Sequence, residues 1–121
     1  MEKINKEILK NRFKDLILKN PDGFTSNKNG ILLNLNKGYS VSITNNLNKN
    51  PDVLIEDLFK LIKKHKVVFY NVGGWYSEKD KLYFLDISFY TNKLNRAVNI
   101  GLKNKQQAIF DFKEMRCINL N

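Results

Sequence analysis

Residues 67–90 read VVFYNVGGWYSEKDKLYFLDISFY, and this stretch decides the fold. Two runs within it, 67–76 and 82–90, are rich in β-branched and aromatic residues, which favour extended strands. The polar residues 77–81 separate the two runs, and so short a polar link predicts a β-hairpin. Alternation along the second run places Tyr83, Leu85, Ile87 and Phe89 on one face and Leu82, Phe84, Asp86, Ser88 and Tyr90 on the other.

The chain before the hairpin begins with an amphipathic segment. Apolar residues at helical spacing predict a helix over residues 1–19 that ends near Asn20, ahead of a proline and an Asp-Gly turn. The short apolar run 31–35 predicts a strand, and the strict apolar-polar alternation of residues 39–44 predicts a second one.

A second helix is expected to start at Pro51, and its apolar stripe covers residues 54–62. After the hairpin, Asn92 is placed to cap a third helix. Two further strands are expected at residues 107–112 and 116–120, the second being the weaker pattern.

These elements predict an α+β fold with a mainly antiparallel sheet of five or six strands and three helices. The expected order is α-β-β-α-β-β-α-β, with one more strand at the C-terminal end. Short hairpin links favour antiparallel pairing, and helices pack against one side of such a sheet. Residues 1–121 are expected to form a single domain, with the helix at 1–19 allowed a peripheral position.

Composition limits the class of protein. The chain has 121 residues, 42% of them hydrophobic, which suffices for one core. No apolar run approaches the roughly 20 residues that cross a bilayer, so no membrane partner and a cytoplasmic location are expected. Cys117 and His65 are each the only residue of their type, so we expect no disulfide, no metal and no cofactor.

The net charge of +9 suggests an anionic partner, but it has a second interpretation. Lysine and asparagine are abundant and arginine is rare, which is also the composition that an AT-rich genome produces. Lys63, Lys64 and Lys66 form a basic patch that is explained equally well by the end of the second helix, where cations complement the dipole. Scarce arginine argues against specific base recognition.

No complete catalytic constellation is found. The pair Gly73-Gly74 lacks the third glycine and the following helix of a phosphate-binding loop. Asp86 lies inside an apolar strand without an acidic partner in sequence, and we expect it on a half-exposed face or bonded to backbone. Catalytic residues are therefore expected to be absent, and an enzyme is the third-ranked class.

Aromatic density in the hairpin is the strongest functional signal. Such rings form a stacking platform for bases, an anchor patch for a protein, or cross-strand pairs that only stabilise the hairpin. We expect Trp75 to be the anchor, presented by a bulge at the Gly-Gly pair; the competing interpretation places Trp75 in the core. The predicted partner-binding residues are Gly73, Gly74, Trp75, Tyr76, Lys79, Lys81 and Tyr83.

Three blocks of the sequence form a joint pattern. They are GYSVSI at 38–43, the hairpin motifs GGWY at 73–76 and LYFLDIS at 82–88, and a block where Ala97 and Gly101 precede Asn104, Gln106 or Gln107, and AIFD at 108–111. This pattern resembles a group of small proteins of bacterial phages, plasmids and genomic islands. The resemblance covers roughly the C-terminal two-thirds of the chain and brings no catalytic residue. It implies a setting in which small proteins block host machinery, inhibitors of CRISPR effectors being one such class.

The leading hypothesis is a non-enzymatic mobile-element protein that binds and inhibits a host protein or ribonucleoprotein complex in the bacterial cytoplasm. The alternative is an autonomous nucleic-acid-binding module that uses lysines and hairpin aromatics. A monomer or small homodimer is expected, and any affinity of the isolated chain for nucleic acid should be weak and non-specific.

Overall fold

The computed structural model describes residues 4–120 and contains three helices and a seven-stranded sheet. In chain order the elements are α1 (Lys6–Lys19), β1 (Phe24–Asn27), β2 (Tyr39–Ser42), β3 (Leu47–Asn48), α2 (Pro51–His65), β4 (Asn71–Ser77), β5 (Leu82–Thr91), α3 (Leu94–Lys103), β6 (Ala108–Asp111) and β7 (Arg116–Asn119). Every strand pairing is antiparallel, in the order β1-β4-β5-β2-β6-β7, with β3 also paired to β5. The predicted α+β class with a mainly antiparallel sheet is confirmed, and the strand count is slightly higher than expected.

One strand prediction in the first half of the chain was wrong, and two strands there were missed. Residues 31–35 form no strand and make only an isolated bridge between Ser26 and Leu32. The strand lies earlier, at β1, where Phe24 pairs with Gly74 of the hairpin. The two-residue strand β3 was not predicted, because a strand this short leaves no periodic pattern in sequence.

The predicted hairpin forms, and its register places Val72 opposite Ile87 and Trp75 opposite Phe84. Its first strand begins at Asn71, so residues 67–70 lie outside it and connect α2 to the sheet. Direct pairing also fixes which side chains share a face. One face of the sheet is covered by the helices and carries Val72, Ile87, Val41 and Ile109. We call it the helix-covered face and its opposite the helix-free face.

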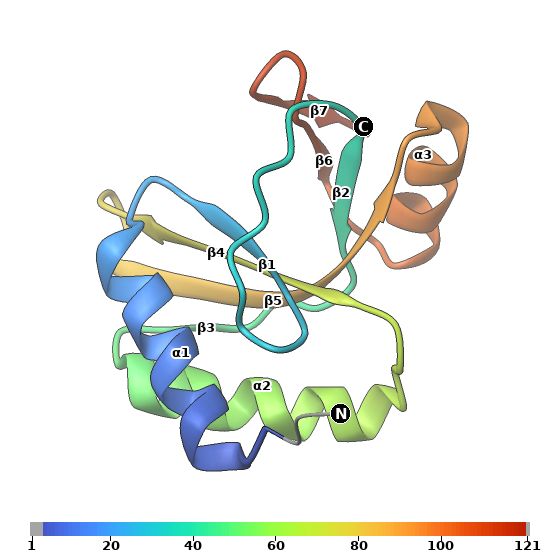
Figure 1. Cartoon of the computed structure of the whole chain (residues 1–121). Helices are drawn as coiled ribbons and strands as arrows, with labels where there is room; N and C mark the ends of the chain where they lie inside the picture. The colour runs from blue at the N-terminus through green and yellow to red at the C-terminus, as the bar shows by residue number, and fades with distance from the viewer. Residues whose placement is uncertain (1–3, 121) are drawn as a thin grey trace.

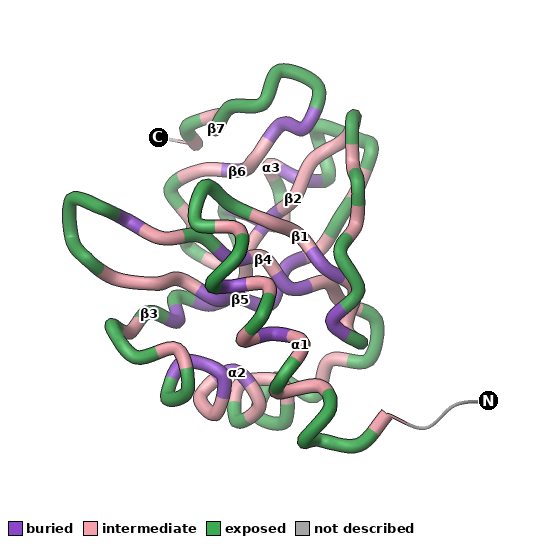
Figure 2. Tube along the Cα trace, turned by 60° about the vertical axis from the view of Figure 1, so that its left-hand side comes forward, coloured by how far each residue is buried: buried purple, intermediate pink, exposed green. Residues whose placement is uncertain are grey.

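Two apolar clusters fill the helix-covered face. The larger one joins α1 and α2 to β4 and β5 and consists of Phe13, Ile17, Leu54, Ile55, Leu58, Val72, Leu85 and Ile87. The smaller cluster packs α3 against the sheet and consists of Ala97, Val41 and Ile109. Figure 2 shows α2 buried where it faces the sheet and exposed on its outer side. The predicted N-terminal helix, whose residues 1–3 lie outside the described range, places Phe13 and Ile17 in the larger cluster.

The segment between β1 and β2 crosses the helix-free face. These strands flank the β4–β5 pair, and Figure 1 shows residues 28–38, in cyan, passing across that pair. The segment is tied down where Leu33 donates its backbone N–H to the Thr25 carbonyl at 2.8 Å and where the Tyr90 hydroxyl donates to the Lys37 carbonyl at 2.8 Å. It therefore covers one part of this face and leaves the end near the hairpin turn open.

Candidate functional site

The open end of the helix-free face carries a row of apolar side chains across three strands. Leu47 of β3 stands opposite Phe84 of β5, and Phe84 stands opposite Trp75 of β4. Residues directly opposite one another point to the same side of a sheet, so the three side chains form one continuous row. Leu47 is 42% exposed and Trp75 is 48% exposed, so the row lies at the surface.

Trp75 is held by stacking. Its ring lies nearly parallel to Phe84, with a 4.6 Å separation between centroids and a 10° interplanar angle. A stacked ring of this kind has few alternative positions, while about half of its surface remains in water. Trp75 therefore lies at the surface and not in the core.

The expected bulge at the glycine pair is wrong. Gly73 and Gly74 continue the regular pairing on both sides, with Thr25 and Phe24 of β1 and with Asp86 and Leu85 of β5. A Cβ atom at Gly74 would lie 2.5 Å from Phe24 Cε1. Glycine is present here because the Phe24 ring lies against the backbone. Close approach of another group is, besides a bulge, the common reason for glycine within a strand. Ordinary alternation, without a bulge, presents Trp75 on the helix-free face.

The predicted partner-binding set is divided between the two faces. Tyr76 and Tyr83 follow the opposite alternation and lie on the helix-covered face, where their ring centroids are 4.6 Å apart at 51°. Tyr83 packs against the larger apolar cluster. The two tyrosines therefore cannot join Trp75 in one flat contact surface.

Lys79 and Lys81 lie in the exposed hairpin turn, as predicted. Lys81 adopts a left-handed backbone with φ of 55°, and Asp80 donates its N–H to the Ser77 hydroxyl at 3.2 Å. Because Glu78 and Asp80 occupy the same turn, its four charges cancel. The basic character of the protein does not arise at this turn.

Lys63, Lys64 and Lys66 are exposed at the C-terminal end of α2. Lys66 closes the helix in a left-handed conformation with φ of 53° and donates its N–H to the Lys63 carbonyl. Figure 1 places this end of α2 and the hairpin turn at opposite ends of the sheet. The structure thus keeps the basic patch away from Trp75.

Asp86 is 8% exposed and takes part in a buried hydrogen-bond network. One carboxylate oxygen accepts from the Thr44 hydroxyl and from the Asn46 N–H, both at 2.7 Å, so the expectation of a bond to backbone is confirmed. The Asn46 amide donates in turn to the carbonyls of Leu54 and Leu85. Burial raises the pKa of Asp86 to about 6, while the two hydrogen bonds oppose that shift. The network closes the gap where β2 ends and β3 begins along β5.

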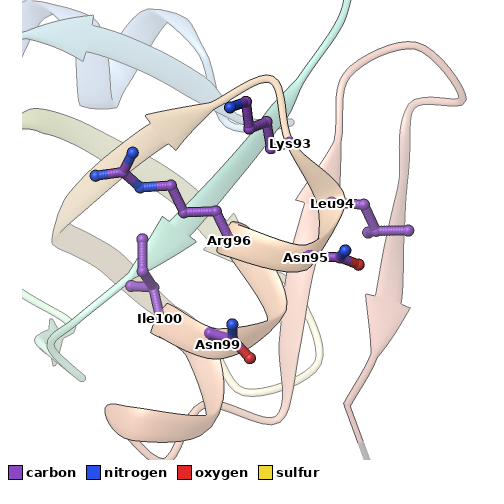
Figure 3. A pocket seen from close by; sticks show the side chains of 6 residues that line it. All are labelled: Lys93, Leu94, Asn95, Arg96, Asn99 and Ile100. Carbon is purple, nitrogen blue, oxygen red and sulfur yellow. The ribbon is translucent and has the colours of Figure 1, made fainter.

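A shallow hollow on α3 was not predicted as a site. It is lined by Lys93, Leu94, Asn95, Arg96, Asn99 and Ile100, and Figure 3 shows the long side chains of Lys93 and Arg96 extending to the same side. The sequence signal for it is the complete lack of acidic residues between Asp86 and Asp111. The predicted cap at Asn92 is wrong: Lys93 takes the cap position and makes no side-chain capping bond.

Within residues 4–120, no group of three or more His, Cys, Asp or Glu side chains is placed to hold a metal ion. The only cysteine and the only histidine do not form a pair, since Cys117 lies on β7 and His65 ends α2, on opposite sides of the molecule in Figure 1. None of the helices described is long and apolar enough to cross a membrane.

The surface row of Leu47, Phe84 and Trp75 is the candidate that contains the predicted anchor. Comparison of the chain with protein-family models, curated proteins and solved structures finds no match.

Proposed function

We propose that this chain is a non-enzymatic binding protein whose partner docks on the open end of the helix-free face, with Trp75 as the anchor. The observation that carries the proposal is the Trp75 ring, which is fixed by stacking on Phe84 and still half exposed. Tryptophan is enriched among the residues whose truncation costs most binding energy. A ring that is already immobilised loses little conformational entropy when a partner covers it.

Leu47 and Phe84 extend the apolar contact on one side of Trp75, and the exposed turn at residues 78–81 supplies polar groups at its end. An apolar centre with a polar rim is the usual composition of a protein interface. Balanced charges at the turn suit a partner without a strong charge of either sign at this contact.

The class of partner follows from the resemblance to proteins of mobile elements, which supports a host protein or ribonucleoprotein complex in the bacterial cytoplasm. The residues of that pattern build the fold. Gly74 makes room for Phe24, Asp86 accepts the bonds that join β2, β3 and β5, and a Cβ at Gly101 would lie 2.5 Å from Leu120 Cδ1. The pattern therefore supports the class of partner, while its residues have structural roles.

The alternative of a nucleic-acid-binding module built from lysines and hairpin aromatics has less support. Such a module needs its cations beside the stacking rings. Here Lys63, Lys64 and Lys66 lie at the far end of the sheet from Trp75, and the lysines of the hairpin turn are balanced by acids.

The test is a comparison of Trp75→Ala with Leu102→Ala, a matched truncation of an exposed apolar side chain on α3 that belongs to neither the row nor its rim. Each variant is assayed for melting temperature and for capture of proteins from a bacterial host lysate, with and without nuclease. We expect a nuclease-resistant partner that Trp75→Ala loses by more than about tenfold, a change of about 1.4 kcal/mol, while both variants melt as folded proteins. Equal capture by wild type and Trp75→Ala, at equal stability, contradicts the proposal.

A further inference from the structure

The connection between α2 and β4 exposes an aromatic ring that the fold does not use. Phe69 is 85% exposed, and its neighbour Val68 is 61% exposed. A ring so open to water buries almost no apolar area and contributes little to folding. The Lys28 ammonium donates to the Val68 carbonyl at 3.1 Å and lies 5.6 Å from the centroid of the Phe69 ring. The loop is thereby tied to the turn that follows β1.

The chain segments on both sides of this contact are rich in lysine and lack acids. The chain has no acidic residue between Asp57 and Glu78, a stretch that contains Lys63, Lys64 and Lys66, and none between Asp22 and Asp52, which contains Lys28. The ion pairs within the described residues all involve lysines of α1. Lys28 lies over the Phe69 ring, and three exposed lysines at the C-terminal end of α2, Lys63, Lys64 and Lys66, precede the connection that carries it. We name these four lysines and Phe69 the lysine end.

We propose that the lysine end binds single-stranded nucleic acid without sequence preference, with a base stacked on Phe69 and the lysines contacting phosphates. Lys28 lies over the Phe69 ring, and the high exposure of that ring leaves room for a flat base to stack. Lysines supply point charges for the backbone and lack the bidentate geometry that reads bases, which makes the contact insensitive to sequence.

This surface is separate from the one around Trp75, at the opposite end of the sheet. A partner that presents both protein and single-stranded nucleic acid could be held at both ends at once. Neither proposal depends on the other, because each has its own aromatic residue and its own variant.

The experiment measures fluorescence anisotropy of a labelled oligothymidine strand against wild type, Phe69→Ala, Phe69→Leu and Trp75→Ala over a salt series. Phe69→Leu is the informative substitution, because leucine keeps apolar area and removes the aromatic face. We expect both Phe69 variants to bind at least about fivefold more weakly with an unchanged salt slope, and Trp75→Ala to bind as wild type does. The double variant Lys64→Ala with Lys66→Ala should reduce the salt slope by about 1.4, since each lost phosphate contact on a single strand is worth about 0.7.

Three outcomes overturn the proposal. Wild-type affinity in Phe69→Leu, with loss in Phe69→Ala, shows apolar docking in place of stacking. Unchanged oligothymidine binding by both Phe69 variants removes the ring from the site. Phe69-dependent sedimentation with phosphatidylserine-containing vesicles, together with oligothymidine binding that ignores Phe69, assigns the surface to a lipid headgroup layer. Melting curves of each variant accompany the binding data, and the exposure of Phe69 predicts that they coincide with wild type.

Discussion

Two aromatic pairs stand next to each other on one hairpin and have opposite surroundings. Trp75 stacks on Phe84 and Tyr76 contacts Tyr83, and both centroid distances are 4.6 Å. The first pair lies on the helix-free face and leaves Trp75 half exposed, whereas Tyr83 of the second pair packs on the apolar cluster beneath α1 and α2. A close cross-strand contact between rings is thus common to both pairs, and the cover provided by distant elements decides which pair is open to a partner.

The largest loss of stability is expected for a truncation in the core of the helix-covered face. Ile87 is fully buried between β5 and the helices, so Ile87→Ala removes packed methyl groups and leaves a cavity. We expect a loss of about 2 to 5 kcal/mol in the free energy of unfolding, measured by urea denaturation. A loss below about 1 kcal/mol would show that this face is not the stabilising one.

The buried Asp86, on the helix-free face, should make the stability of the protein depend on pH. Its pKa is about 6 in the folded protein against an ordinary value of 3.8, so the native state binds a proton more readily than the unfolded chain between these two values. The free energy of unfolding should therefore decrease as pH rises from about 4 to 6, by up to about 3 kcal/mol, and this contribution is constant above that window.

Asp86→Asn is the matched control for this contribution. The amide keeps an oxygen that accepts from Thr44 and Asn46 and does not titrate. Urea denaturation at pH 4, 5, 6 and 7 should show that the difference in stability between wild type and variant shifts in favour of the variant as pH rises. A difference that is independent of pH would mean that the pKa of Asp86 is not raised in the folded protein.

Gly74 and Gly73 sharpen the comparison, because adjacent positions point to opposite faces. A Cβ at Gly74 would meet the Phe24 ring at 2.5 Å, whereas one at Gly73 would have only ordinary contacts at 3.9 Å. We expect Gly74→Ala to cost about 1 to 3 kcal/mol by overpacking and Gly73→Ala to be neutral within about 1 kcal/mol. Thermal denaturation of the two variants side by side measures the difference, and equal costs would argue against close packing of Phe24.

Truncation of Trp75 should have only a small effect on stability. Trp75→Ala removes one stacking partner of Phe84 from a half-exposed position, which is worth about 1 kcal/mol. Urea denaturation should show a smaller loss than for Tyr83→Ala, the corresponding truncation on the covered face. A larger loss of stability for Trp75→Ala than for Tyr83→Ala would show that Trp75 is part of the stabilising core.

Much of the fold follows from local patterns in sequence. The alternation in residues 82–90 and the polar turn before it predicted the hairpin and the separation of its faces, because both are properties of neighbouring residues. The prediction of a strand at residues 31–35 was wrong because the outcome there depends on distant parts of the chain. Leucines in a row do not distinguish a strand from a connection that crosses a sheet, and β1 is a strand only because β4 pairs with it.

The candidate site was predictable only in part. Trp75 was identified from its residue type, but its neighbours Leu47 and Phe84 come together through pairings of β5 with β3 and β4, and β3 has no signal in sequence. Tyr76 and Tyr83 were assigned to the same surface although alternation separates Tyr76 from Trp75. Phe69 belonged to a predicted strand, and only the later start of β4 reveals it as an exposed loop residue.

Strand β5 has one further consequence, for the order in which the protein folds. Its β4 edge is closed by a turn of a few residues, whereas its other edge receives β2 and β3, with Thr44 and Asp86 lying 42 residues apart in the chain. Closing the short loop costs much less chain entropy than closing the long one. The hairpin can therefore form as an early local nucleus, while the buried network around Asp86 assembles only when the distant strands arrive. The Trp75–Phe84 pair thus belongs to the part of the molecule that is organised first, and Leu47 joins it only when β3 pairs with β5.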